Sequence, residues 1–170
     1  MVESGLRLIL KLPFLSNFPG SVDDKGRLSI PADYRHALAP ECDGYLVFTL
    51  GPRNFLNAFP LDFFNAMWEK VESDSAQFAS FSNLERDTLL FGEAVYRQLD
   101  NQGRITLPQE ILRQAGIGKN VVFMGRRTHF TVWDASAYST HRGQIGINAG
   151  EAWQRVIDTN RRASDGKEPR

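Results

Sequence analysis

The chain has 170 residues, of which 42% are hydrophobic and 24% are charged. That is the composition of an ordinary globular protein, and it excludes a chain that is disordered throughout. The 20 basic and 20 acidic side chains cancel, so the net charge does not point to nucleic acid, and no apolar run approaches the length of a membrane span.

Residues 1–13 have no counterpart later in the chain. Their only apolar run, Leu8–Leu10, is too short for the core of a signal peptide. We therefore expect an N-terminal extension without fixed structure, such as an upstream start codon would add. The single cysteine, Cys42, excludes an intrachain disulfide and the usual multi-cysteine zinc sites, and it favours the reducing cytosol.

A duplicated motif dominates the rest of the chain. The stretch Ser21–Pro31 is repeated at Gln98–Pro108, and one offset of 77 residues aligns every identity between them. The identical pairs are Asp23/Asp100, Gly26/Gly103, Arg27/Arg104 and Pro31/Pro108. Agreement at one fixed offset indicates an internal repeat.

Each copy predicts a strand, a glycine turn, a second strand and a helix. Polar and apolar residues alternate in Arg27–Ile30 and Arg104–Leu107, as in half-buried strands. The glycine before each strand suits a tight turn, so we expect each copy to form a hairpin with the strand upstream. A proline then opens a short helix with an acidic residue in its first turn.

The same plan continues after each helix. Gly44–Leu50 and Phe55–Phe59 predict a second hairpin, which the second copy repeats over residues 120–133. Leu61–Glu72 predicts a helix with one apolar face, for the core or a subunit interface. A capping box at Ser82–Glu85 predicts a helix to about Phe91, and a final amphipathic helix is expected from Asn148 to about Asn160.

The expected organisation is thus α+β, with two tandem units and flanking helices. The expected parts are an extension (1–13), a first hairpin domain (17–64), a helical linker (65–93), a second hairpin domain (94–137), a C-terminal helical segment (138–161) and a polar tail (162–170). Charge is unevenly spread along these parts. Residues 61–96 carry seven acidic against two basic side chains, whereas residues 97–127 carry six basic against two acidic ones. One surface is therefore expected to attract phosphate more than another.

The motif Asp-x-x-x-Arg, followed by an alternating strand and a proline, resembles the SpoVT/AbrB swapped-hairpin family. Two such units in a chain of this length resemble the MraZ family of transcriptional regulators within it. The resemblance covers about residues 14–140. It implies a pseudo-dimeric β-barrel, assembly of chains into a ring, and nucleoid association in the cytoplasm. It also implies repression of the division and cell-wall gene cluster through tandem guanine-containing boxes on double-stranded DNA.

The candidate DNA-binding residues lie in the first glycine turn. The fork of Arg27 can donate two hydrogen bonds to guanine O6 and N7, and Lys25 can contact a phosphate. Asp23 is expected to orient Arg27 through a charge-assisted pair, and Gly26 to shape the turn. In the second copy Gln102 replaces the lysine. We therefore interpret Asp100, Gly103 and Arg104 as a structural version of the motif, with Arg97, Arg126 and Arg127 left as alternative contacts to the DNA backbone.

Other functions are weighed against DNA binding. The three histidines lack metal-ligand spacing, and no phosphate loop or nucleophile motif occurs. We therefore expect neither an enzyme nor a bound metal or cofactor. The alternative is an oligomeric protein-interaction or antitoxin-like module without specific DNA readout.

Overall fold

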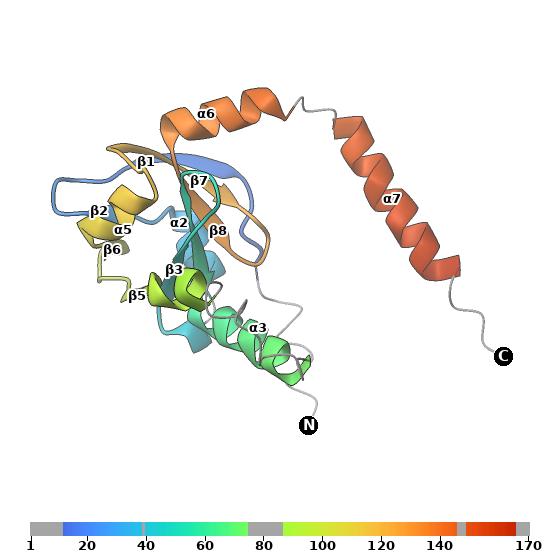
Figure 1. The fold of residues 1–170 in the computed structure, drawn as a ribbon, viewed down its shortest axis with the longest axis horizontal. Helices are drawn as coiled ribbons and strands as arrows, with labels where there is room; N and C mark the ends of the chain where they lie inside the picture. Colours follow the sequence, from blue (N-terminus) through green and yellow to red (C-terminus); the bar gives the residue numbers. More distant parts are fainter. Residues whose placement is uncertain (1–11, 39, 75–86, 146–148, 166–170) are drawn as a thin grey trace. The chain divides into compact units, whose positions relative to one another are not determined.

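The computed structural model describes residues 12–38, 40–74, 87–145 and 149–165. The chain divides into two compact units, residues 1–138 and residues 139–170. Figure 1 shows the elements of both. Of the expected extension at residues 1–13, residues 1–11 lie outside the described residues. The capping box at Ser82–Glu85 also lies outside them.

The two copies have the same order of elements. The first consists of β1 (Asn17–Ser21), β2 (Arg27–Ser29), α2 (Ala32–Ala37), the short 3-10 helix η1 (Pro40–Cys42), β3 (Tyr45–Leu50), β4 (Phe55–Pro60) and α3 (Leu61–Asp74). The second consists of β5 (Val95–Gln98), β6 (Arg104–Thr106), α5 (Gln109–Gln114), β7 (Asn120–Gly125), β8 (Phe130–Asp134) and α6 (Ala135–Gln144). A short π-helix, η2 (Thr88–Gly92), precedes the second copy, and α7 (Ala149–Asp165) follows it. No helix among the described residues is long and apolar enough to cross a bilayer.

The sheets join the two copies. One antiparallel sheet has the order β1-β7-β8-β4-β3-β5, and β2 pairs with β6 in a separate two-stranded ribbon. Strand β1 of the first copy therefore pairs with β7 of the second, and β5 of the second pairs with β3 of the first. Each copy pairs its first strand with the other copy, so both copies contribute strands to this sheet and to the ribbon.

The prediction of a hairpin at each glycine turn is wrong. Strand β1 leaves β2 after one isolated bridge, between Val22 and Leu28. Both strands pair instead with the opposite copy. Strand β1 pairs with β7 from Asn17 opposite Met124 to Ser21 opposite Asn120, and β2 pairs with its own counterpart β6. The hairpins β3–β4 and β7–β8 are confirmed.

The ribbon pairs equivalent residues of the two copies. Leu28 lies directly opposite Ile105, its counterpart in the repeat, with Arg27 opposite Thr106 and Ser29 opposite Arg104. This register is the one that a two-fold axis through the Leu28–Ile105 pair would produce. The ribbon and the open sheet confirm the α+β class, but no barrel closes among the strands of the described residues.

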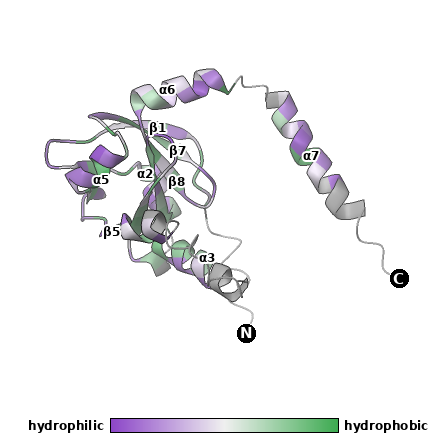
Figure 2. Ribbon diagram, in the orientation of Figure 1, coloured by the Kyte–Doolittle hydropathy of each residue, from purple (hydrophilic) through white to green (hydrophobic). Residues whose placement is uncertain are grey.

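An aromatic cluster fills the core between the copies. Phe130 on β8 is fully buried, and its ring centroid lies 5.4 Å from that of Phe14, 4.9 Å from that of Tyr34 and 6.1 Å from that of Phe123. The Tyr34 hydroxyl donates to the Ser16 carbonyl at 2.8 Å, so this buried polar group is satisfied. Figure 2 shows the hydrophobic residues concentrated on the central strands. Because side chains from both copies share this core, we expect the two to unfold together.

Two helices differ in length from the expectation. Helix α3 continues to Asp74, two residues beyond the predicted end at Glu72. Helix α7 continues to Asp165, so the first part of the predicted polar tail at residues 162–170 is helical. Charged and polar residues on the exposed side of a helix do not interrupt its hydrogen bonds, and neither Gly nor Pro stops α7 before Asp165.

Candidate nucleic-acid interface

The β2–β6 ribbon presents a polar face to solvent. Leu28 and Ile105 point inward, at 0% and 1% exposure. Alternation along a strand places the neighbouring side chains on the opposite face. Those side chains are Arg27, Ser29, Arg104 and Thr106. Two arginines, one from each copy, thus occupy adjacent rows of an exposed two-stranded ribbon.

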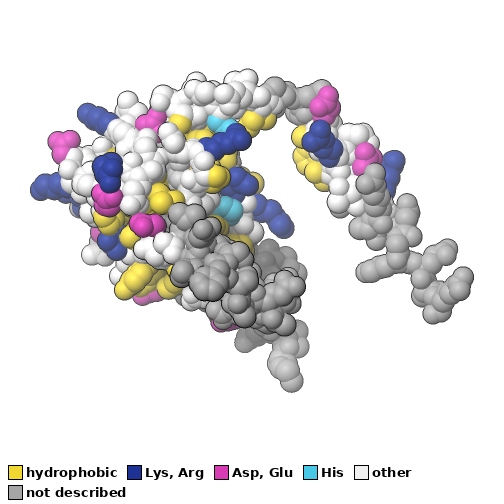
Figure 3. Space-filling model, in the orientation of Figure 1, with side chains coloured by type: hydrophobic (Ala, Val, Ile, Leu, Met, Phe, Trp, Pro, Cys, Tyr) yellow, Lys and Arg dark blue, Asp and Glu magenta, His cyan; other side chains and the backbone are white. Residues whose placement is uncertain are grey.

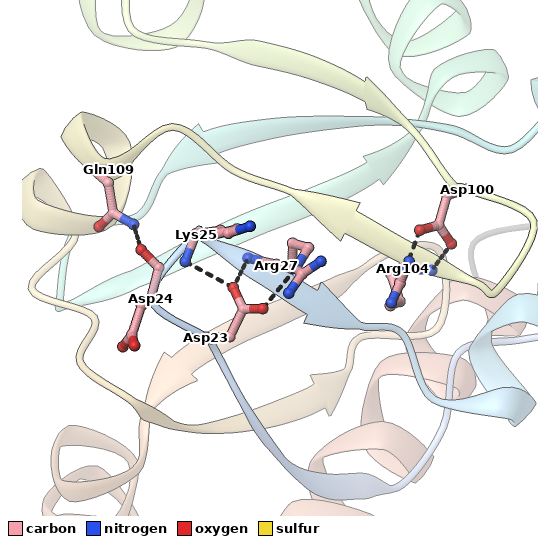
Figure 4. A network of polar contacts seen from close by, with 7 residues as sticks. All are labelled: Asp23, Asp24, Lys25, Arg27, Asp100, Arg104 and Gln109. Carbon is pink, nitrogen blue, oxygen red and sulfur yellow. Dashed lines mark hydrogen bonds and ion pairs between the residues drawn. The ribbon is translucent and has the colours of Figure 1, made fainter.

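The turn before β2 holds Arg27 through Asp23. One carboxylate oxygen of Asp23 accepts from the backbone amides of Lys25 and Arg27, each at 2.9 Å. The other accepts from Arg27 Nε at 2.6 Å, and the Gly26 amide donates to the Asp23 carbonyl at 2.9 Å. Gly26 has φ +76°, a conformation in which other residues are strained. Asp23 therefore holds both the backbone and the side chain of Arg27 within the turn, as Figure 4 shows, and the role of this arrangement in DNA binding stays a prediction.

The second turn repeats this geometry. Asp100 accepts from the Gln102 and Arg104 amides at 2.8 and 2.9 Å and from Arg104 Nε at 2.8 Å. Gly103 has φ +72°. The two turns are therefore alike in how they hold their arginine (Figure 4), and only the residues around them differ.

Each arginine keeps its terminal nitrogens available. Asp23 and Asp100 bond only Nε, and the terminal nitrogens of Arg27 and Arg104 have no hydrogen-bond partner among the described residues. A guanine edge or a phosphate is bonded by just such a pair of guanidinium N–H groups. Because its Nε is fixed by an aspartate, each arginine presents its two terminal nitrogens as oriented hydrogen-bond donors.

Hydrogen bonding keeps the two aspartates ionised. The backbone amide and then the side chain of Arg27 lower the pKa of Asp23, and the Arg104 amide is the largest cause of the lowered pKa of Asp100. A carboxyl with a lowered folded pKa stabilises the fold above its ordinary pKa and loses that effect as the pH falls through the folded value. The two ion pairs are therefore intact at neutral pH.

Basic side chains gather around the ribbon. In Figure 3, Lys and Arg occur together with some Asp and Glu at the left of the view, where Figure 1 places β2, β6 and α5. Lys25 lies not only beside Arg27 but also with Arg97 and Arg104 around one hollow. The sequence placed Arg97 in a basic segment but could not show that strand exchange brings it near the first turn.

The three histidines do not join this interface as a group. His36 is exposed on α2, and the ring of His129 packs at a tilt against Phe59, with ring centroids 4.5 Å apart. Within the described residues no group of three or more His, Cys, Asp or Glu could hold a metal ion.

His129 is expected to make stability depend on pH. Burial first, and then the charge of Arg126, lowers the pKa of His129 to about 4. Between about pH 6.5 and pH 4 the unfolded chain therefore binds a proton that the folded chain excludes, so stability falls as the pH falls across this window. The slope is at most about 1.4 kcal/mol per pH unit, and solvent around the half-exposed ring reduces it.

Urea unfolding at several pH values tests this, with His129→Gln as the comparison. The variant should lose stability less steeply than the parent between about pH 6.5 and pH 4. Parallel curves for the two proteins would contradict a neutral, desolvated His129.

Comparison with known proteins bears on both copies. A family model described as "MraZ protein, putative antitoxin-like" matches residues 16–89 and again residues 90–160, which confirms the duplication. The chain is similar to the transcriptional regulator MraZ of Methylococcus capsulatus, at 39% identity over 67% of this chain and 74% of the relative. It is also similar to the transcriptional regulators MraZ of Nitrosospira multiformis (34% identity, 74% of this chain and 84% of the relative) and Nitrosomonas eutropha (32%, 88% and 89%).

Proposed function

Because the chain belongs to the MraZ family, we propose that it is a DNA-binding transcriptional regulator that reads guanine through Arg27. The relatives that carry the regulator name support the general role. The finer proposal is that the protein represses the promoter of the division and cell-wall gene cluster, acting in the cytoplasm and associated with the nucleoid.

One observation carries the proposal of base readout. Arg27 is held on an exposed ribbon by an Nε–Asp23 bond of 2.6 Å while its two terminal nitrogens have no partner among the described residues. A two-stranded ribbon fits the major groove, where a bidentate arginine distinguishes guanine by about 1–3 kcal/mol. Lys25, next to it on the turn, suits a phosphate.

Several copies of the chain are needed for useful affinity. One arginine and one lysine neutralise few phosphates, and phosphate neutralisation supplies most of the binding energy of such proteins. We propose that chains form a ring that presents the same turn to tandem boxes about one helical turn apart. Linked contacts then add through high effective concentration.

Fluorescence anisotropy with a labelled duplex from the gene's own upstream region tests the proposal. A duplex with scrambled boxes is the comparison, at two salt concentrations. The parent protein should bind the native duplex more tightly, and Arg27→Ala should lose about 5- to 150-fold of that preference, the loss expected for one bidentate guanine contact. Arg27→Lys keeps the charge but not the fork, so it should retain salt-dependent binding while losing the preference.

The second copy supplies the internal comparison. Arg104→Ala removes the same ion pair from the same kind of turn, and we expect a smaller loss of box preference because Gln102 replaces the lysine there. Unchanged oligomer size and melting temperature would separate lost contacts from lost structure. A larger loss of box preference for Arg104→Ala than for Arg27→Ala would show that Arg104 of the second copy, and not Arg27, contacts the guanine.

A protein-interaction module is the second candidate, and the antitoxin-like description of the matching family model favours it. In that case the anisotropy experiment would show equal, weak binding to both duplexes. A flat dependence of log affinity on log salt would point the same way, since phosphate contacts impose a slope.

A further inference from the structure

A hollow of about 370 Å³ lies where the first glycine turn meets the second copy. Lys25 of the first turn, Arg97 of β5 and Arg104 of β6 contribute its basic side chains. The other lining residues are Gln98, Asp100, Thr106, Leu107, Pro108 and Gln109. Strand exchange is what brings these groups together, because Lys25 and Arg97 are 72 residues apart in the sequence.

The hollow carries a net positive charge. Its one carboxylate, Asp100, accepts three hydrogen bonds, two from backbone amides and one from Arg104 Nε. Arg97 donates one terminal N–H to the Tyr96 carbonyl at 2.7 Å and has no other hydrogen bond within the described residues. Lys25 Nζ has no bonded partner there either. Three cations thus face one carboxylate that is already engaged.

A contact between the copies positions Lys25 over this hollow. Gln109 Nε2 on α5 donates to the Asp24 carbonyl at 3.3 Å, and the Leu107 amide donates to the Gly26 carbonyl at 2.9 Å. Both bonds tie the first turn to residues that line the hollow, and Figure 4 shows the bond from Gln109. The lysine is therefore mounted on a turn that is fixed at the rim.

The repeat shows that the fold does not require this chemistry. At the offset of 77 residues, Gly20 corresponds to Arg97, Gln102 to Lys25 and Ala32 to Gln109. The arginine of the motif is repeated at this offset, but Lys25, Arg97 and Gln109 are not. The charge of the hollow is therefore a property of these particular residues and not of the strand pairing.

We propose that this hollow binds a phosphate group, held jointly by Arg97 and Arg104 with Lys25 at the rim. Its shallow form suits a phosphate that is part of a larger molecule or that approaches from solvent. Two sources carry this chemistry, the backbone of a duplex and a free nucleoside triphosphate. The assignment of the phosphate to a DNA duplex rests on the proposed function. In that case the phosphate contact in the hollow fixes the register of the ribbon on DNA, while Arg27 reads a base.

Arg97→Gln tests the site, with Arg53→Gln as the matched control. Arg53 is exposed in the turn between β3 and β4, so its replacement removes the same charge outside the hollow. Binding of native and scrambled duplexes is measured by anisotropy over a range of salt concentrations. Binding of ATP and of inorganic pyrophosphate to the DNA-free protein is measured by calorimetry.

If the phosphate belongs to the duplex, Arg97→Gln should weaken binding to the native and the scrambled duplex about equally. The magnitude of the slope of log affinity against log salt should then fall by about 0.9 for each chain on the DNA. If the source is a free phosphate compound, ATP or pyrophosphate should bind the parent and Arg53→Gln but not Arg97→Gln. If Arg97→Gln matches Arg53→Gln in every arm, the proposal is overturned. Loss of box preference in Arg27→Ala with no change in Arg97→Gln would reject the hollow and leave the regulator proposal intact.

Discussion

Replacement of Phe130 by alanine is expected to lower the free energy of unfolding by about 3–5 kcal/mol, the cost of removing a large buried aromatic side chain. Phe130 is fully buried on β8, and three aromatic rings, those of Phe14, Tyr34 and Phe123, lie within 6.1 Å of its centroid. Removal of the ring leaves a cavity that these neighbours can fill only in part. Because proteins are stable by only about 5–15 kcal/mol, this change is a large share of the total.

Urea unfolding followed by circular dichroism measures this loss. Tyr96→Ala is the control, because Tyr96 is 65% exposed on the edge strand β5 and its truncation should cost less than about 1 kcal/mol. Phe130→Leu keeps most of the volume and remains measurable if the alanine variant does not fold. A loss below about 1 kcal/mol for Phe130→Ala would show that the aromatic cluster does not hold the copies together.

A single transition is part of the same prediction. Phe14 and Tyr34 come from the first copy and Phe123 and Phe130 from the second, so damage to the cluster affects both. The parent and the variants should each unfold in one step, with coincident curves by fluorescence and circular dichroism. Separate transitions for the two copies would contradict the shared core.

Local sequence patterns predicted most of the elements but not their partners. Alternation over Arg27–Ile30 and the glycine at Gly26 depend only on neighbouring residues, so the strand and the turn were predictable. Pairing depends on which strand offers a matching apolar face, and β1 pairs with β7, about 100 residues later. Nothing local to the turn distinguishes a hairpin from exchanged strands, which is why the hairpins were wrongly predicted.

The candidate interface shows the same division. Asp23 and Arg27 are only four positions apart, and the repeated motif predicted their pair together with its copy at Asp100–Arg104. The neighbourhood of Lys25 was not predictable, because Arg97 and Gln109 reach it only through strand exchange and the packing of α5. The segregation of basic residues after residue 96 was the one signal in the sequence that pointed to this surface.

The two glycines of the repeat should differ in how well they tolerate a side chain. Gly26 and Gly103 both have positive φ, so alanine costs about 1–2 kcal/mol at either position. A Cβ at Gly26 would lie 2.3 Å from the Leu107 carbonyl oxygen, which belongs to the backbone of the opposite copy. A Cβ at Gly103 would lie 2.4 Å from Cδ of Arg35, a flexible side chain that can move away.

Gly26→Ala is therefore expected to destabilise the protein more than Gly103→Ala, by an additional amount of about 1–3 kcal/mol, as for other forced contacts with well-packed atoms. The backbone must shift at Leu107, whose amide also donates to the Gly26 carbonyl at 2.9 Å, so the turn that carries Lys25 and Arg27 separates from the second copy. Urea unfolding of the two variants measures the difference, and duplex binding should be weakened more by Gly26→Ala. Equal losses of stability would mean that the positive φ alone sets the cost and that contact with Leu107 does not hold the first turn in place.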